Sequence, residues 1–165
     1  MKIGILSDTH NNQSNVRSAL EILRQEQVDT LFHCGDITEL ETTLLLVEFR
    51  VICTFGNGDW NAAEIRQNLL YFRADNVSGI SYEGNWDGIK IAATHGHLPG
   101  ILENQIQSGE FDYVFHGHSH LSEDRQAGRT RVINPGALGG LKREPRGFAI
   151  LDLESGKLER KTIDG

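Results

Sequence analysis

Aspartate, asparagine and histidine residues occur in this chain in five short motifs whose side chains could bind metal ions. The motifs are Asp-Thr-His at 8–10, Gly-Asp at 35–36, Gly-Asn at 56–57, and two histidine clusters at 95–97 and 116–120. Their carboxylate, amide and imidazole groups, with no thiolate, suit Mn, Fe, Zn, Ni or Co better than a structural zinc site. The sequence therefore predicts a metal site, with the candidate ligands Asp8, His10, Asp36, Asn57, His95, His118 and His120.

The density of histidine supports this prediction more than any single motif does. Asp-x-His and Gly-Asp steps are common in loops, where they bind backbone or form turns. All seven histidines of the chain, however, lie in or beside these motifs, and five of them fall within 95–97 and 116–120. The glycines beside them allow the backbone to approach an ion closely. The constellation as a whole is typical of metal binding.

A β-α-β pattern is predicted to position the first motifs. Short apolar runs at 2–7 and 28–33 predict strands, and a third strand is predicted at 50–55. Thr38 and Glu41 have the spacing of a capping box, which predicts a second helix. Nearly every candidate ligand follows a predicted strand, which is where ligands bind in sheets with βα crossovers. The first helix would bury Val16, Ala19, Leu20 and Leu23, and the second Leu40, Leu44 and Val47.

Beyond residue 68 the pattern becomes richer in strands. We predict a helix at 99–108 and strands at 69–73, 78–82, 89–94, 112–115, 123–127, 130–134, 147–153 and 156–162. Two sheets packed face to face, with helices outside, would bury these strands, although periodicity leaves their order open.

The spacing within two motifs predicts a local geometry. Asp8 and His10 are two residues apart, as are His118 and His120. In extended backbone the side chains of such a pair point the same way. Each pair is therefore predicted to reach one metal.

Composition narrows the class of protein. The 165 residues suffice for one domain spanning 1–165, and no segment approaches the ~20 apolar residues of a membrane span. The first residues carry one positive charge and a very short apolar run, which predicts a strand and not a secretory signal. Cys34 and Cys53 show no CxxC spacing, which fits a reducing compartment, so we expect a cytoplasmic protein.

The net charge bears on the partners. Twenty-three acidic and sixteen basic residues give a net charge of −7, which opposes the attraction to a phosphate backbone that nucleic-acid binders use. Stable binding of nucleic acid is therefore not expected. Bound divalent cations would reverse the field locally, so a small phosphate ester remains an acceptable substrate.

The order of the motifs resembles that of a known family. DTH, GD, GN, THGH and GHSH follow one another as in the calcineurin-like metallophosphoesterases, and within them the small single-domain phosphodiesterases called YfcE-like. The segment Ile133-Asn134-Pro135-Gly136 is also similar to a family element, so the resemblance covers almost the whole chain. It implies an α/β (α+β) fold, a four-layer α/β/β/α sandwich of two mixed β-sheets flanked by helices.

The resemblance also implies a binuclear metal centre and its chemistry. Asp36 would bridge the two ions, because a carboxylate has two oxygens available to join cations roughly 3.5–4 Å apart. A hydroxide between the ions would attack a small phosphate ester, with Asp36, Asn57 and His97 as the catalytic candidates. Mn²⁺ is the expected ion, with Ni²⁺, Co²⁺, Zn²⁺ or Fe²⁺ as alternatives. The first ion would be held by Asp8, His10 and His120, and the second by Asn57, His95 and His118.

Neighbouring polar residues have less specific assignments. His97 is predicted to contact substrate or protonate the leaving group, with a hydrogen bond to a metal ligand as the equal alternative. His116 and Asp59 are predicted to orient ligands by hydrogen bonds, and His33 to fill a packing position.

The sequence leaves open the roles of one tryptophan and three basic residues near the motifs. Trp60 would line the mouth of the site or serve the fold alone. Lys142, Arg143 and Arg146 form a basic cluster, which is interpreted as a solvated loop, with a phosphate contact as the alternative.

The chain departs from the family pattern at three positions. Gly58 stands where many relatives have a histidine, or in the YfcE-like group a cysteine, so it has no side chain to protonate a leaving oxygen. We therefore expect a preference for diesters and for acidic leaving groups. Asn11 and Ala137 stand where Gly and Ser are common, which bears on substrate shape and not on metal binding.

Rival functions remain on the same fold. A non-catalytic protein-interaction scaffold would have lost part of the metal set, whereas every candidate ligand position here holds a competent side chain. A nuclease or a cyclic-nucleotide phosphodiesterase would share the metal centre but need further substrate contacts. A binding module with a single metal is a third alternative. Association into a homo-oligomer stays open.

Overall fold

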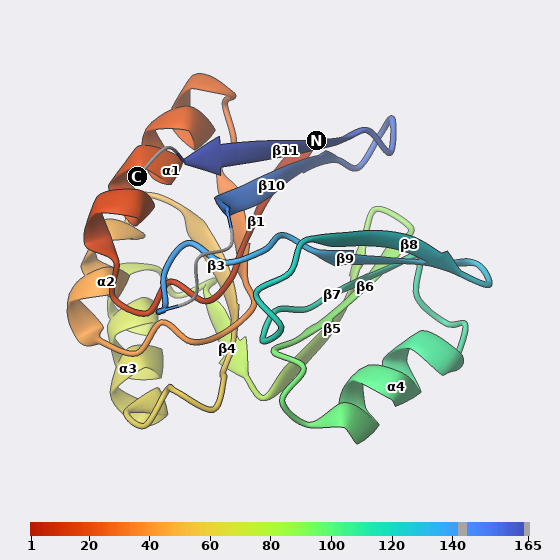
Figure 1. The fold of residues 1–165 in the computed structure, drawn as a ribbon, viewed down its shortest axis with the longest axis horizontal. Coiled ribbons are helices and arrows are strands. Elements are labelled where there is room, and N and C mark those ends of the chain that lie inside the picture. The colour runs from red at the N-terminus through yellow and green to blue at the C-terminus, as the bar shows by residue number, and fades with distance from the viewer. Residues whose placement is uncertain (142–144, 164–165) are drawn as a thin grey trace.

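Two mixed β-sheets form the centre of the protein. The computed structural model describes residues 1–141 and 145–163, and Figure 1 shows their arrangement. The six-stranded sheet has the order β11-β10-β1-β2-β3-β4 and the five-stranded sheet the order β5-β6-β7-β9-β8. The first sheet comprises β1 (Lys2–Leu6), β2 (Thr30–His33), β3 (Arg50–Thr54), β4 (Val77–Gly79), β10 (Arg146–Asp152) and β11 (Leu158–Ile163). The second comprises β5 (Ser81–Trp86), β6 (Ile89–Thr94), β7 (Tyr113–Phe115), β8 (Glu123–Ala127) and β9 (Thr130–Asn134).

Parallel strands lie at the centre of both sheets. In the first sheet β1, β2, β3 and β4 are parallel, and β10 and β11 extend it antiparallel. In the second sheet β6, β7 and β9 are parallel, with antiparallel β5 and β8 at the edges. The carboxyl ends of the parallel strands within each sheet therefore lie along one edge, where the candidate ligands follow them.

Helices cover the outer face of each sheet. The helices α1 (Gln13–Gln25), α2 (Leu40–Leu45) and α3 (Ala62–Phe72) pack on the six-stranded sheet, and α4 (Pro99–Gln107) packs on the five-stranded sheet (Figure 1). The result is the four-layer α/β/β/α sandwich that the family resemblance implied. In the described residues, no helix combines the length and hydrophobicity needed to cross a bilayer.

Strand periodicity divides the core into layers. Ile3 and Ile5 face the space between the two sheets, whereas Leu6 faces the helices. Likewise Phe32 points between the sheets and Leu31 toward the helices. Alternate side chains of a strand point to opposite faces, so a strand with both faces covered is apolar throughout. The predicted face of α1 is buried as expected, with Val16, Ala19, Leu20 and Leu23 all in the helix layer of the core.

The predicted strand at 69–73 is wrong. Residues 69–72 form the last turn of α3, which buries Ile65 and Leu69 on one face and leaves Leu70 and Tyr71 exposed. Residues four apart lie on the same face of a helix, so Ile65 and Leu69 pack together against the sheet. The apolar run was misleading because three of its residues lie on the exposed or half-exposed surface.

The predicted capping box of α2 is also wrong, and of the three residues of its predicted apolar face only Leu40 packs against the core. Glu39 is the N-cap residue, with no side-chain cap, while the backbone N–H of Thr38 donates to Asp59. Leu44 and Val47 are exposed. The helix instead buries two threonines, because their hydroxyls find internal acceptors: Thr42 donates to Asn11 and Thr43 to the Leu40 carbonyl.

Phe32 should be a main contributor to the stability of the layer between the sheets. Its ring contacts the rings of Tyr82, Trp86 and Phe115 at centroid distances of 5.6, 5.7 and 5.1 Å. Phe32→Ala should lower the free energy of unfolding in urea by about 3–5 kcal/mol. The control Tyr71→Ala, at an exposed ring, should change it by less than about 0.5 kcal/mol. Equal losses for both variants would contradict this account of the core.

Candidate metal centre

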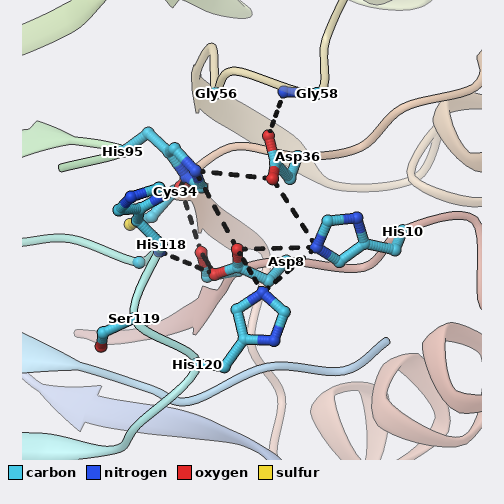
Figure 2. Close-up of polar contacts among 12 residues, drawn as sticks. Asp8, His10, Cys34, Asp36, Gly56, Gly58, His95, His118, Ser119 and His120 are labelled. Atoms are coloured by element: carbon cyan, nitrogen blue, oxygen red, sulfur yellow. Dashed lines mark hydrogen bonds and ion pairs between the residues drawn. The ribbon is translucent and has the colours of Figure 1, made fainter. Parts of the chain in front are cut away.

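The candidate ligands meet where strands of both sheets end. Asp8 follows β1, Asp36 follows β2, Asn57 follows β3 and His95 follows β6. Backbone hydrogen bonds tie these strand ends together: the N–H of Asp8 donates to the Gly35 carbonyl at 2.9 Å. Similarly, the N–H of His10 donates to the Asp36 carbonyl at 3.0 Å. Figure 2 shows the side chains of Asp8, Asp36 and His95 directed toward one another from these separate segments.

Asp8 uses its two carboxylate oxygens differently. Oδ2 accepts a hydrogen bond from Ser7 Oγ at 2.6 Å and one from the His118 N–H at 3.0 Å. Oδ1 has no hydrogen-bond donor and faces Nε2 of His120 at 3.2 Å and Nε2 of His10 at 3.8 Å (Figure 2). Since Asp8 is fully buried, its free oxygen is available only to this cluster.

Asp36 repeats this division. Its Oδ1 accepts a hydrogen bond from the Gly58 N–H at 2.7 Å. Its Oδ2 lies 3.6 Å from Nε2 of His10 and 3.5 Å from Nε2 of His95. Each buried carboxylate therefore has one oxygen held by the protein and one directed at imidazole nitrogens.

His95 supplies the clearest test of whether a cation fits. Its Nδ1 lies 2.6 Å from the Cys34 carbonyl, which can only accept, so Nδ1 carries the proton and donates it. Nε2 then presents a lone pair, is fully buried, and has no hydrogen-bond partner. That lone pair faces Oδ2 of Asp36 at 3.5 Å and Oδ1 of Asp8 at 4.0 Å. A cation between these electron-rich atoms would compensate for the removal of the carboxylates from water.

The spacing of these atoms agrees with metal coordination. Two groups of side chains, Asp8 with His10 and His120, and Asp8 with Asp36 and His95, keep their ligand atoms within 4.8 Å of one another. Ligand atoms about 2.1 Å from a shared ion lie about 3.0–3.4 Å apart. The two shortest distances here, both 3.2 Å, run from Nε2 of His120 to Nε2 of His10 and to Oδ1 of Asp8, and both are in that range. The donor set fits a divalent cation.

The His118 ring lies beside these two groups of ligand atoms, and Asn57 lines the same cavity as His118. The volume of this cavity is about 760 Å³, and its wall also includes His10, Asp36 and His120. The His118 ring packs edge-on against the His95 ring at a centroid distance of 5.1 Å. Of the seven predicted ligands, the structure thus draws five together and places two at the adjoining wall.

The prediction of extended backbone at the two His-containing pairs is wrong. Asp8, His10, His118 and His120 have φ values of 51°, 41°, 68° and 62°, all in the left-handed region. Asp8 and His10 still face a common point, but the rings of His118 and His120 diverge toward His95 and His10 respectively. The chain turns back sharply after each strand, at a cost of order 1–3 kcal/mol per strained residue. The hydrogen bonds between strand ends offset that cost.

Two glycines permit the carboxylates to be packed so closely. A Cβ atom at Gly56 would lie 2.1 Å from Oδ1 of Asp36. A Cβ atom at Gly117 would lie 1.8 Å from Oγ of Ser7, which donates to Asp8. Any side chain at either position would displace a carboxylate, so the glycines of the GN and GHSH motifs have a steric role.

Asp59 orients the loop that carries Asp36. Its Oδ2 accepts hydrogen bonds from the N–H groups of Asp36 and Gly56 at 2.9 and 2.8 Å, and its Oδ1 accepts one from Thr38 at 2.8 Å. Burial raises the pKa of Asp59, while these three donors oppose the rise. Asp59 therefore acts on the site through the backbone of its neighbours.

Asn134 performs a similar role for the loop that carries His118. Its Nδ2 donates to the Gly117 carbonyl at 2.8 Å and to Oγ of Ser119 at 3.1 Å. His116 pairs with Glu123 through Nε2 at 3.0 Å. The motifs indicated no role for Ser7 or Asn134. The Asn-Pro-Gly segment was the only signal for Asn134, and no motif signalled Ser7.

Four other residues had been given roles from the sequence: His97, Trp60, Lys142 and Arg143. The His97 ring lies 5.4 Å from the His95 ring, and burial, then the imidazoles of His95 and His118, lower the pKa of His97. Trp60 is 93% exposed. Lys142 and Arg143 lie outside the described residues.

Arg146 is not part of a solvated loop, which corrects that interpretation. Its guanidinium donates to the backbone carbonyls of Gly139 and Gly140. The group therefore binds the chain itself beside the cavity.

A comparison with protein families matches residues 1–156 to the calcineurin-like phosphoesterase superfamily domain. The phosphodiesterase MJ0936 of Methanocaldococcus jannaschii is 36% identical over 159 residues, which cover 93% of this chain and 94% of that protein. The probable metallophosphoesterase YsnB of Bacillus subtilis is 29% identical over 162 residues, covering 94% and 86% of the two chains.

Solved structures share the fold. An archaeal phosphodiesterase superposes with a TM-score of 0.93 at 33% identity, covering 99% of this chain and all of that one. The phosphoesterase YfcE of E. coli gives a TM-score of 0.72 at 24% identity, with 99% and 100% covered. Vps29 of Entamoeba histolytica, in its D62A form, gives 0.70 at 18% identity with the same coverage. The last two similarities concern the fold alone.

His33 predicts a pH dependence of stability. It is buried behind the cluster, with Nε2 3.3 Å from Oγ1 of Thr9, and burial, reinforced by His95, lowers the pKa of His33 to about 3. Below pH 6.5, His33 binds a proton in the unfolded chain but stays neutral in the folded protein. The free energy of unfolding therefore falls as the pH drops toward 3. Between pH 7 and 5, the metal-free protein should lose about 2 kcal/mol more than a His33→Gln variant does.

Urea unfolding in EDTA at both pH values measures this difference. The comparison uses the change with pH and not the absolute stability, so a fixed cost of the substitution cancels. Parallel losses in the two proteins would show that His33 titrates normally in the folded state.

Proposed function

The chain belongs to the calcineurin-like phosphoesterase superfamily, and from that premise we propose that it is a metal-dependent phosphodiesterase that hydrolyses small phosphate esters. The relative MJ0936, 36% identical over nearly the whole of both chains, is a phosphodiesterase. An archaeal phosphodiesterase also superposes along this entire fold with a TM-score of 0.93.

One observation carries the proposal. Asp8 and Asp36 are buried carboxylates, each with one oxygen fixed by protein donors and the other directed at histidine nitrogens. Asp36 also lines a cavity that is large enough for a small ester. Such a donor set is suited to holding divalent ions beside a substrate.

The ligands divide between two ions in our proposal. Asp36 would be shared by the two ligand sets, and the nearly equal distances from its Oδ2 to His10, 3.6 Å, and to His95, 3.5 Å, support this role. Oxygen and nitrogen donors without thiolate favour Mn²⁺, with Ni²⁺, Co²⁺, Zn²⁺ and Fe²⁺ as alternatives. One ion is assigned to Asp8, His10 and His120, and the other to Asn57, His95 and His118.

The metals and the chain contribute different parts of the chemistry. When bound, two divalent ions supply Lewis-acid stabilisation of phosphoryl oxygens and lower the pKa of a water molecule. Asp36 keeps the two ligand sets together, and the Asn57 amide and the His118 ring line the cavity where the ester lies. His97, next to His95, is proposed to exchange a proton with the departing oxygen.

This proposal is preferred to a non-catalytic scaffold on the same fold. Vps29 structures superpose with a TM-score of about 0.70, so the fold alone does not separate the two functions. The complete donor set of this chain favours catalysis. A net charge of −7 disfavours a nuclease. The two free, buried cysteines, Cys34 and Cys53, support a location in the reducing cytoplasm.

An Asp36→Asn variant tests the central role of Asp36. The amide oxygen can still accept from Gly58, but an NH₂ donor replaces Oδ2. We expect Mn²⁺ bound per chain, measured by elemental analysis, to fall below two. We also expect kcat/KM for bis-p-nitrophenyl phosphate to fall at least about 100-fold, since the phosphate loses part of its charge stabilisation.

The control is Asp75→Asn, at a surface carboxylate paired with Arg73. It should keep the metal content and turnover of the original protein. Full metal and full activity in Asp36→Asn would refute the role proposed for Asp36.

The glycine at position 58 leads us to expect that the protein hydrolyses diesters faster than monoesters. Because Gly58 offers no side chain to protonate a leaving group, bis-p-nitrophenyl phosphate should be hydrolysed with a kcat/KM at least about 10-fold above that for p-nitrophenyl phosphate in saturating Mn²⁺. Among aryl diesters, turnover should rise as the leaving phenol becomes more acidic. Faster hydrolysis of the monoester would contradict the assignment.

A further inference from the structure

Arg146 clamps a loop beside the metal cavity. It stands at the start of β10, and its Nη2 donates to the Gly140 carbonyl at 2.6 Å while Nη1 donates to the Gly139 carbonyl. The planar fork of a guanidinium can hold two neighbouring carbonyls at once, which a lysine ammonium cannot reproduce. Arg146 therefore fixes the orientation of two successive peptide groups.

The clamped loop forms the wall behind two candidate ligands. Gly140 lines the metal cavity, and a Cβ atom placed there would lie 2.7 Å from Cε1 of His120 and 3.1 Å from Cδ2 of His10. The two imidazoles thus leave no room for a side chain at Gly140. A small movement of this wall would leave space into which either ring could rotate.

The same wall is joined to the segment that carries Asp8. The N–H of Gly139 donates to the Asp8 carbonyl at 2.8 Å, and a Cβ atom at Gly139 would lie 2.0 Å from the Thr9 carbonyl oxygen. Gly140 itself has a φ of 87°, a left-handed conformation that must be held in place. Arg146 supplies the hydrogen bonds to both carbonyls of this tight step.

We propose that Arg146 is a positioning residue, which sets the imidazoles of His10 and His120 through the Gly139–Gly140 backbone. This inference rests on the proposed function, because it concerns the ion assigned to Asp8, His10 and His120. Partners that orient metal ligands are worth about 10- to 100-fold in metal affinity. Loss of the clamp should therefore weaken the binding of this ion and leave unchanged the binding of the ion assigned to Asn57, His95 and His118.

Isothermal titration of metal-free protein with Mn²⁺ tests the proposal. We expect Arg146→Lys to raise one of the two dissociation constants at least about 10-fold and to leave the other within about twofold. Gly140→Ala, which strains the backbone and crowds both rings, should give the same selective loss without touching Arg146. Thermal unfolding without metal reports separately on the stability of each variant.

Arg131→Lys is the matched control. The Arg131 guanidinium also clamps a loop carbonyl, that of Gly156 at 2.6 Å, and pairs with Asp124, but none of these residues lines the metal cavity. This variant should lose stability in the metal-free state and keep both Mn²⁺ constants.

The outcomes separate the inference from the function on which it rests. If wild-type protein binds no Mn²⁺ pair or hydrolyses no diester, the proposed function fails. If wild-type protein does both, but Arg146→Lys keeps both constants, weakens them equally, or changes only the KM for the diester, the positioning role is refuted. A KM effect alone would make Arg146 a substrate contact instead.

Discussion

The burial of two carboxylates within reach of the same imidazoles is the constraint on which the rest of this structure depends. Asp8 and Asp36 are removed from water, where each charge would be well solvated, and removing a charge from water without compensation is costly. Protein donors satisfy one oxygen of each carboxylate. The other oxygens face histidine nitrogens, an arrangement that a divalent cation would compensate.

Much of the surrounding architecture follows from the need to keep these oxygens in place. Ser7 donates to Oδ2 of Asp8 and Gly58 to Oδ1 of Asp36. Asp59 accepts from the backbone of the Asp36 loop. Five of the seven candidate ligands adopt left-handed backbone, which non-glycine residues rarely do. Such strain persists only where the surroundings determine the conformation, and here the parallel strand ends of two sheets provide that rigidity. The site is consequently organised before any substrate arrives.

The fold itself is compatible with more than one function. A similar sandwich occurs in the phosphoesterase YfcE at 24% identity and in Vps29 at 18% identity. Layers and topology therefore establish where a site can form, at the carboxyl ends of the strands, but not what it does. In this chain the carboxylates, histidines and close-packed glycines distinguish the site, and they are concentrated at that edge of the sheets.

Local periodicity was sufficient for part of the fold. The strands around 2–7, 89–94 and 130–134 and the face of α1 depend on burial patterns within a few residues, and these were predicted correctly. Periodicity failed at α3, where an apolar run is partly exposed, and at α2, where buried threonines look polar in the sequence. Both errors arose because burial depends on which neighbours cover a segment.

For the site, the sequence by itself determined which chemical groups are present and, through their position after strands, that they would gather at one edge. It did not determine their geometry. Only the tertiary structure turned Asp8 and His10 inward through left-handed backbone, separated His118 from His120, and made Arg146 a clamp for Gly140. The inward turns and the separation of the two rings rest on contacts between residues far apart in the chain. The Arg146 clamp joins near neighbours, but it depends on a loop conformation that local spacing does not encode.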